Sequence, residues 1–414
     1  MAPLEPWEKV FVNGQSFSAT RHGDIQCTFC HGGTQSSDME TAHAGMIADP
    51  SMGPNNVCTT CHKDQSKNFD QSLHASLGGY WTTLNVRSGT ENHPALQTMF
   101  GNHCARCHTS CGDCHISQPA SVGGGFVDGH VINKTPSMTR NCTACHGSRV
   151  GNEYLGKNEE LPGDVHFRQG RMNCVACHTG ADMHGEDYGD TPPANRYDGA
   201  QMPACTDCHA EALSLESENV MHLAHGEKLS CQVCHAITYT SCDGCHVAIS
   251  DKTGNPFFET QATYFTFFIG QNALKNENRP YNYVTVRHIP IAPTSYQFYG
   301  ENLLPNFNAL PTWAYATPHN IQRKAPQASA CENCHASAQY FLTADKVKPE
   351  ERAANAAVIV TTLPPSMDEI NNAKPMPAGH ANYKPGMCAS CHANLPASHA
   401  GRIESACIVC HRLP

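Results

Sequence analysis

The sequence predicts a mostly irregular fold in which short α-helices and one small β-hairpin region are joined by coil. Three observations predict it. The 414 residues include 32 Gly and 27 Pro, which favour turns over long elements. Only 40% of the residues are hydrophobic, although a chain of this length ordinarily buries a substantial core. Of the 31 aromatic residues, 14 lie between Phe257 and Tyr315, so one segment differs in character from the rest.

The expected regular elements are few and short. Within the aromatic segment, ATYFTFFIG (262–270) and YNYVTVRHIPI (281–291) are rich in strand-forming residues and are separated by a polar stretch, which predicts a β-hairpin with a long loop. Proline-broken coil should follow as far as Trp313. Residues 211–225 and the KPEERAANAA stretch, in which Pro349 marks a helix start, predict short helices. The surrounding piece, 343–375, is interpreted as a connector.

The cysteines carry the strongest signal. All 24 of them fall into twelve Cys-x-x-Cys-His units, numbered here motifs 1 to 12. In chain order the motifs are Cys27, Cys30 and His31; Cys58, Cys61 and His62; Cys104, Cys107 and His108; Cys111, Cys114 and His115; Cys142, Cys145 and His146; Cys174, Cys177 and His178; Cys205, Cys208 and His209; Cys231, Cys234 and His235; Cys242, Cys245 and His246; Cys331, Cys334 and His335; Cys388, Cys391 and His392; and Cys407, Cys410 and His411. This unit is the attachment signature of c-type haem.

Other uses of paired cysteines explain the pattern less well. A structural zinc site needs four ligands and does not require His directly after the second Cys. A disulfide scaffold gives uneven spacings and no fixed His, and a thioredoxin-like redox pair occurs once, beside a βαβ pattern. Twelve repeats with the histidine present each time therefore predict twelve covalently attached haems c, which would supply the missing core.

The spacing has a physical reason on a helical turn. Positions i and i+3 are near neighbours there, and i+4 lies on the same face. Two thiols so placed reach two substituents on one porphyrin edge, and the next imidazole reaches the iron. Motifs 3 and 4 are separated only by Thr109 and Ser110, so their porphyrins should lie in or near contact.

Motif density divides the chain into three regions. Residues 1–250 hold nine motifs, residues 251–330 hold none, and residues 331–414 hold the last three. The motif-free, aromatic and β-rich insert is interpreted as a small packing subdomain that covers haem edges. A docking or polymerisation surface is the alternative for this insert.

The second axial ligand of each iron is expected to be histidine. Outside the motifs the chain has 14 histidines for twelve irons, a near match that favours bis-His ligation over ligation by the 13 methionines. The candidate ligands are His22, His43, His74, His103, His130, His166, His184, His222, His225, His319, His380 and His399. His93 and His288 are weaker candidates. His222 and His225 stand three residues apart on an expected helix, so both should face haems.

Charge and targeting features bear on partners and location. The formal net charge of −10, made more negative by haem propionates, disfavours nucleic acid and anionic lipid. Other cytochromes, and extracellular acceptors such as metal oxides, suit this charge better. Attachment of c-type haem occurs outside the cytoplasmic membrane, so export to the cell surface, the exterior or the periplasm is expected. MAPLEPWEKV lacks a signal-peptide pattern, which suggests a trimmed mature chain, and no apolar run is long enough to predict a membrane span.

The whole chain resembles the multihaem c-type cytochromes, through its twelve motifs and surplus histidines. Within that class it looks most like the extracellular cytochrome filaments, on the strength of the twelve motifs, the early His22 and a motif ending at His411. That resemblance implies a loop-rich, haem-cored, bis-His chain that polymerises so that haems run unbroken between subunits. It also implies that a histidine of one subunit can ligate a haem of the next.

The predicted function is long-distance electron conduction rather than catalysis. A filament and a monomeric or membrane-complex-bound carrier both remain open. The alternative class is a multihaem oxidoreductase that acts on nitrogen or sulfur oxyanions, which would need one iron with an open position. All twelve motifs are regular and histidine is plentiful, which favours the conductor.

Overall fold

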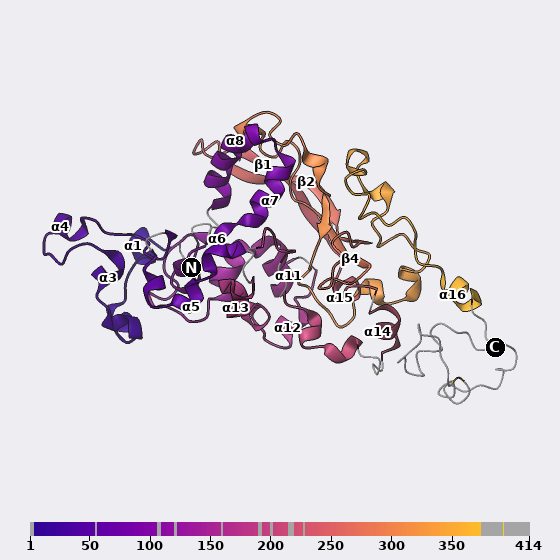
Figure 1. Cartoon of the computed structure of the whole chain (residues 1–414), viewed down its shortest axis with the longest axis horizontal. Helices are drawn as coiled ribbons and strands as arrows, with labels where there is room; N and C mark the ends of the chain where they lie inside the picture. The colour runs from indigo at the N-terminus through magenta and orange to yellow at the C-terminus, as the bar shows by residue number, and fades with distance from the viewer. Residues whose placement is uncertain are drawn as a thin grey trace. The chain divides into compact units, whose positions relative to one another are not determined.

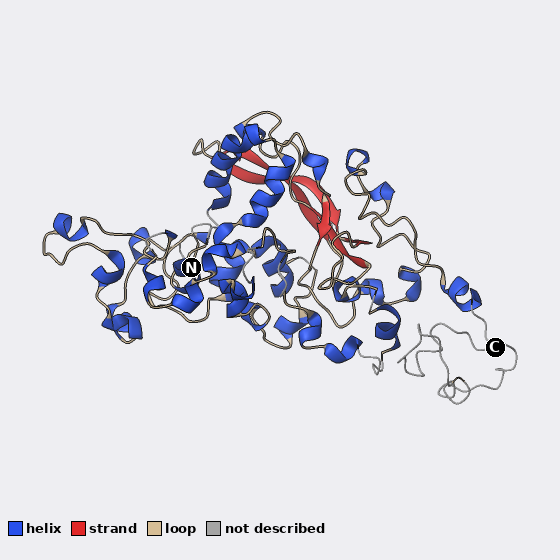
Figure 2. Cartoon of the chain, in the orientation of Figure 1, coloured by secondary structure: helices blue, strands red, loops and turns tan. Residues whose placement is uncertain are grey.

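The structure is a computed structural model, and it describes residues 4–53, 56–105, 109–119, 122–158, 160–188, 193–198, 202–213, 219–226, 228–373 and His392. Short helices, small antiparallel sheets and much coil make up these residues (Figure 2), which confirms the coarse fold class. They form two compact units. Unit 1 is Met1–Lys157, Gly170–Met202 and Tyr296–Leu304; unit 2 is Asn158–Gln169, Pro203–Ser295 and Pro305–Pro414. The units interleave in sequence.

Unit 1 is built from short helical segments (Figure 1). Several begin at a side chain that accepts a backbone N–H of the first turn, as Asn13, Asp38, Ser72 and Ser110 do. The α-helices are α1 (Pro6–Lys9), α2 (Gly14–Ser18), α3 (Cys27–His31), α4 (Met39–His43), α5 (Lys63–Ser66), α6 (Leu73–Ser76), α7 (Gly78–Arg87), α8 (His93–Met99), α9 (Cys111–His115), α10 (Thr143–Cys145), α11 (Asn152–Leu155) and α13 (Gly180–His184). The 3-10 and π segments are η1 (Arg21–Asp24), η3 (Val57–Thr60), η4 (Phe69–Gln71), η5 (Thr90–Asn92), η6 (Phe100–Cys104), η9 (Met138–Cys142), η10 (Gly147–Gly151), η11 (Cys174–Ala176), η12 (Glu186–Tyr188) and η15 (Gln297–Tyr299).

The apolar packing of unit 1 is concentrated in α7 and α8. Leu84, Leu96 and Met99 are buried there, and the rings of Trp81 and Phe100 lie 4.8 Å apart. Among the described residues before position 75, by contrast, no hydrophobic side chain is buried. The first part of this unit therefore folds without an apolar side-chain core of its own.

Unit 2 holds the sheets (Figure 2). Strand β1 (Thr240–Ile249) pairs with β2 (Pro256–Thr266), and β4 (Tyr283–His288) lies between β3 (Phe268–Gln271) and β5 (Trp313–Tyr315), all antiparallel. The helices are α12 (Val165–Arg168), α14 (Val220–His225), α15 (Cys231–His235) and α16 (Met367–Ala373). The 3-10 segments are η13 (Cys205–Asp207), η14 (Ala210–Leu213), η16 (Phe307–Ala309), η17 (Pro326–Ala328), η18 (Cys331–Asn333), η19 (Ala344–Lys346) and η20 (Pro349–Glu351).

The expected hairpin is present with altered bounds. Strands β3 and β4 pair as predicted, with Phe268 opposite Val286. The first β-rich run is divided, however, because residues up to Thr266 belong to β2 and pair with β1. Trp313 was expected in coil and instead begins β5, opposite His288. The sheet content is therefore larger than the sequence indicated.

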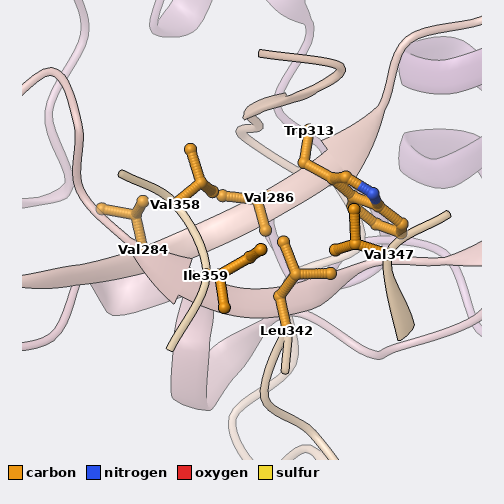
Figure 3. Packing of buried hydrophobic residues seen from close by; sticks show 7 residues of the cluster. All are labelled: Val284, Val286, Trp313, Leu342, Val347, Val358 and Ile359. Carbon is orange, nitrogen blue, oxygen red and sulfur yellow. The ribbon is translucent and has the colours of Figure 1, made fainter. Parts of the chain in front are cut away.

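Unit 2 has a conventional apolar core on this sheet (Figure 3). Side chains from β4, β5 and the 342–359 segment pack together there: Val284, Val286, Trp313, Leu342, Val347, Val358 and Ile359. The 343–375 piece is thus part of the core, and its interpretation as a connector was wrong. Its expected helix is reduced to the 3-10 turn η20. The side-chain oxygen of Asn355 accepts the backbone N–H groups of Thr312 and Trp313, which ties this segment to β5.

Among the described residues, no helix has the length and apolar composition needed to cross a membrane.

Candidate haem-binding sites

Most described motifs form one helical turn, as predicted. Motifs 1, 4 and 8 coincide with α3, α9 and α15, each of which begins at the first Cys and ends at the His. In motifs 2, 5, 6, 7 and 10 the backbone N–H of the histidine donates to the carbonyl of the first Cys at 2.9–3.0 Å.

In motifs 2, 6 and 7 the turn is of the 3-10 type and ends at the second cysteine. The backbone N–H groups of Cys61, Cys177 and Cys208 each donate to the carbonyl of the first Cys of the same motif at 3.3 Å. Side chains three residues apart eclipse one another in a 3-10 turn, so both thiols of a motif lie on one face. These three second cysteines are exposed, so their thiols are accessible for bonding.

Two motifs are described only in part, and one is not described. Motif 3 is described at Cys104 and motif 11 at His392, while motif 12 lies outside the described residues. The predicted haem attachments that fall outside the described residues are therefore those of Cys107, Cys388, Cys391, Cys407 and Cys410.

Motif 9 departs from the helical geometry. It lies within β1, so its backbone is extended and paired with β2. The backbone N–H of Cys245 donates to the carbonyl of Pro290 at 2.8 Å, so it does not close a turn on Cys242. Cross-strand pairing has overridden the local turn, and the helical-turn expectation for Cys242 and Cys245 was wrong.

A bulge interrupts the strand at motif 9. Asp243 stands opposite both Ala262 and Thr263, and Gly244 next to it has a φ of +75°. The Nε2 of His246 is buried and has no hydrogen-bond partner. The surroundings of this motif histidine thus differ from those of the histidines on helical turns.

Among the described residues, seven pairs of histidine rings have centroids 5.8–6.2 Å apart. Every pair joins one motif histidine to one histidine outside the motifs. The pairs are His31 with His130, His62 with His22, His115 with His184, His146 with His74, His209 with His166, His235 with His222, and His335 with His225. Both histidines of α14 therefore belong to such pairs.

This separation fits a metal ion between the rings. Imidazole nitrogen binds metals at about 2.0–2.1 Å, so two rings on opposite sides of one ion have centroids roughly 6 Å apart. Ordinary aromatic contacts span about 4.5–7 Å, so distance alone does not decide. Chance packing would also bring together two motif histidines or two others, and none of the seven pairs is of that kind.

The second nitrogen of many rings is fixed in the way that metal ligands require. Nδ1 of His115 lies 2.7 Å from the carbonyl oxygen of Asn133, so Nδ1 must carry the proton and Nε2 is left for the facing ring. Backbone carbonyls also accept from His31, His225, His235 and His335. Carboxylates accept from two others: Asp164 from His166 at 2.8 Å, and Asp182 from His178 at 3.3 Å.

Burial favours the neutral form of six paired non-motif histidines, and the neutral imidazole is the form that binds metal. Removal from water lowers the pKa of His74, and the neighbouring His178 lowers it further, although Asp182 acts against this. Burial likewise is the largest cause of a lowered pKa in five others, namely His22, His130, His184, His222 and His225.

The remaining candidate histidines differ in their surroundings. Nε2 of His103 lies 2.7 Å from the hydroxyl of Tyr299, which favours a hydrogen-bonding role over ligation. Exposed His43 has its Nδ1 held by the carbonyl of Met39 at 2.8 Å. His319 is half-buried, and the Nε2 of His93 is buried without a hydrogen-bond partner. His108, His380, His399 and His411 lie outside the described residues.

His288 has a structural role. It is 2% exposed, and its Nε2 lies 2.9 Å from a carboxylate oxygen of Glu351 while its Nδ1 lies 2.8 Å from the carbonyl of Ile289. Burial alone would raise the pKa of Glu351, but the hydrogen bonds from His288 and Thr312 outweigh it and hold the pKa below its ordinary value. Both ring nitrogens are engaged, in keeping with the weak ligand prediction.

Thiols of different motifs meet in three places. Cys58 shares a hydrogen bond with Cys111, Cys142 with Cys174, and Cys205 with Cys231, each time the first Cys of its motif. In the first two contacts the hydrogen bond lowers the pKa of the accepting thiol, Cys111 or Cys142, and raises that of the donor, Cys58 or Cys174. In the third contact it lowers the pKa of Cys231. These six cysteines are not joined in disulfides. If they attach no haem, the close thiols of two motifs could instead be oxidised to a disulfide.

Half-buried second cysteines lie away from these contacts. Burial is the largest cause of a raised pKa at Cys114, to about 12, and at Cys234, to about 11. Burial also raises the pKa of Cys30 and Cys334. These thiols therefore stay protonated and uncharged at neutral pH, and their surroundings suit an apolar thioether better than a thiolate.

Sequence reasoning missed three polar residues at these sites. Asp164 and Asp182 hold histidines, and Asn56 contacts two motifs, since its side chain accepts from Cys58 N at 3.1 Å and donates to Cys111 Sγ at 3.5 Å. The sequence signal for both carboxylates was their spacing: Asp164 stands two residues before His166, and Asp182 stands four residues after His178. In the described part of the chain, no three Cys, His, Asp or Glu side chains converge as a structural zinc site would require.

Comparison with known proteins adds no assignment: no family model matches the sequence, and no curated protein or solved structure is similar to it.

Proposed function

We propose that this chain is a dodecahaem c-type cytochrome that conducts electrons through closely spaced haems in the periplasm or outside the cell. The observation that carries the proposal is the set of seven histidine pairs, each of one motif and one non-motif histidine about 6 Å apart. A protein with another use for its Cys-x-x-Cys-His units has no reason to set a second imidazole opposite seven of its motif imidazoles.

The chemistry that each bound haem supplies is a one-electron change between ferric and ferrous iron. The protein's residues attach, orient and shield that group. The helical turn of a motif brings two thiols and one imidazole to the same face. The facing non-motif histidine would be the second residue to hold the iron, and the hydrogen bond at its Nδ1, as in His225, sets the direction of Nε2.

The shortage of apolar packing in unit 1 supports a cofactor core. Its described residues before position 75 bury no hydrophobic side chain, while Trp7, Phe11 and Phe29 are more than half exposed. A folded segment of this length cannot be stable without buried apolar surface. Porphyrin rings held by motifs 1 and 2 would provide it.

Direct contacts link the candidate sites of unit 1 into a series. His22, which faces motif 2, lies five residues before motif 1. Asn56 links motifs 2 and 4, as described above. The amide of Asn141, beside motif 5, donates to the carbonyls of Asp113 and Ser117 around motif 4 at 2.7 Å. In α13, His184 faces motif 4 while Asp182 holds the histidine of motif 6.

Unit 2 links its sites in the same manner. Helix α14 presents His222 to motif 8 and His225 to motif 10 within one turn. The adjacent residues Ile321 and Gln322 tie motif 7 to motif 8. Ile321 N donates to Asp164, which holds His166, and the carbonyl of Gln322 accepts from the histidine of motif 8. Sites in such direct succession favour conduction, because a catalyst needs only one good site.

The test of conduction uses the purified holoprotein dried as a film across closely spaced electrodes. Current should flow with haem attached, and it should be lost in the same polypeptide produced without haem attachment. An insulating film of fully haem-loaded protein would contradict conduction while leaving the haem assignment intact.

Self-association into a filament is part of this proposal. His43 supports it, because the ring is exposed and Nδ1 is held by the carbonyl of Met39 four residues earlier. His225 has the same arrangement with Met221 and faces His335. Electron microscopy should show ordered fibres that the His43→Ala variant does not form. Uniform single particles of the unaltered protein would refute polymerisation. The net charge of −10 suits cationic or mineral acceptors.

An oxidoreductase with one open haem is the second candidate, and motif 9 is the observation that favours it. Its strand geometry differs from that of the other described motifs, and Nε2 of His246 is buried without a hydrogen-bond partner. Low-temperature EPR separates the two functions. A high-spin ferric signal from one haem, together with turnover of nitrite, hydroxylamine or tetrathionate, would establish the enzyme.

A further inference from the structure

The imidazoles of the candidate sites differ in what accepts their Nδ1 proton. Five paired rings donate to neutral backbone carbonyls, whereas His166 and His178 donate to the carboxylates of Asp164 and Asp182. Hydrogen bonds to an ionised acceptor are roughly twice as strong as neutral ones and shift negative charge onto the donor ring. His166 faces the histidine of motif 7, and His178 is the histidine of motif 6. The electron density on these two rings should therefore differ from that on the other five.

The site of Asp164 is built around the carboxylate. The side chain is 3% exposed. One oxygen accepts both the Nδ1 proton and the backbone N–H of His166 at 2.8 Å, and the other accepts the backbone N–H of Ile321 at 2.8 Å. The group cannot turn away from the ring without breaking all three bonds. Its charge is thus held beside the imidazole in surroundings that screen it weakly.

Asp182 is placed by a different element. It lies in α13, four residues after His178, and its side chain is 8% exposed. The carboxylate lies 3.3 Å from Nδ1 of His178, a longer contact than that of Asp164. The smaller effect is therefore expected from Asp182.

We infer that Asp164 and Asp182 are positioning residues that lower the reduction potentials of the two haems whose irons His209 and His178 would ligate. The inference rests on the proposed function. Its sign follows from charge: the ferric haem core carries one more positive charge than the ferrous core, so a nearby fixed carboxylate stabilises the ferric state. The four sites with carbonyl acceptors, those of motifs 1, 4, 8 and 10, lack this contribution and should have higher potentials.

The experiment is a potentiometric titration of the holoprotein and its Asp164→Asn and Asp182→Asn variants, followed by optical and EPR spectra. Asparagine keeps the size and the accepting oxygen but removes the charge. In Asp164→Asn the reduction equilibrium of one haem should favour the ferrous state by about tenfold, which is about 59 mV for a one-electron couple. Asp182→Asn should shift a different haem by less. The EPR g-values of the same two haems should change.

The control is Asp38→Asn, which removes an exposed capping carboxylate that accepts from Thr41 and touches no histidine. Its titration should match that of the unaltered protein. If both test variants carry all their haems and still titrate like the unaltered protein, the inference is wrong, while the proposed function stands. Should Asp164→Asn fail to fold, Asp182→Asn decides, because its carboxylate caps no helix. A protein without haem would show no titration and would refute the proposed function instead.

Discussion

Replacing His225 and His288 one at a time distinguishes a proposed iron ligand, His225, from a histidine with a structural role, His288. His225 faces the histidine of motif 10 at 6.1 Å with Nδ1 held by a backbone carbonyl. His225→Ala should therefore leave one iron with an open position, about one-twelfth of the iron if all twelve motifs are loaded. The reduced variant should bind about one carbon monoxide per chain, and its ferric EPR spectrum should gain a matching high-spin signal.

His288→Ala should change stability instead. The variant leaves the carboxylate of Glu351 buried, with Thr312 and the more distant Lys348 as its remaining partners. Breaking such a buried pair costs about 3–5 kcal/mol, a large share of the total stability of a domain. Thermal or denaturant unfolding of unit 2 measures this loss, while carbon monoxide binding should stay as in the unaltered protein. A low-spin His225→Ala protein, or a His288→Ala protein that gains an open iron, would refute the division of roles.

Two further predictions concern unit 2 and the helices of unit 1. Because hydrogen bonds hold the folded-state pKa of Glu351 below its ordinary value, its contribution to stability is present above that value and is lost as pH falls through the folded pKa. Denaturant unfolding over a pH series should show this decline in the unaltered protein and a flatter profile in Glu351→Gln; equal slopes would contradict it. Gly270→Ala should destabilise the sheet by about 1–3 kcal/mol, because the added methyl group would lie 2.8 Å from Val286. Gly79→Ala in α7 has open space and should stabilise by about 0.5–1 kcal/mol, which makes it the matched control.

Local patterns made several features predictable. The β3–β4 hairpin followed from two β-rich runs around a polar loop, and the helical turn that carries His222 and His225 followed from the residues around them. Each of these needs only neighbours in sequence. The composition also indicated a chain with too few apolar side chains, which matches the sparse core of the first part of unit 1.

Contacts distant in sequence were not predictable. Nothing in the sequence near His31 indicates that it faces His130, because the pairing depends on how intervening loops return. Motif 9 shows a similar limit, since pairing with β2 set the backbone of Cys245 against the local preference for a turn. The connector interpretation of 343–375 failed because the burial of Val347 depends on the sheet it packs against.

The most direct measurement of the central claim is the intact mass of the denatured, purified chain. Thioether bonds survive denaturation, so attached haems remain as mass increments. The account predicts a single species heavier than the polypeptide by twelve haems, one for each Cys-x-x-Cys-His motif. A chain at the polypeptide mass, or lighter by the hydrogens lost to disulfides between contacts such as Cys58 and Cys111, would contradict it.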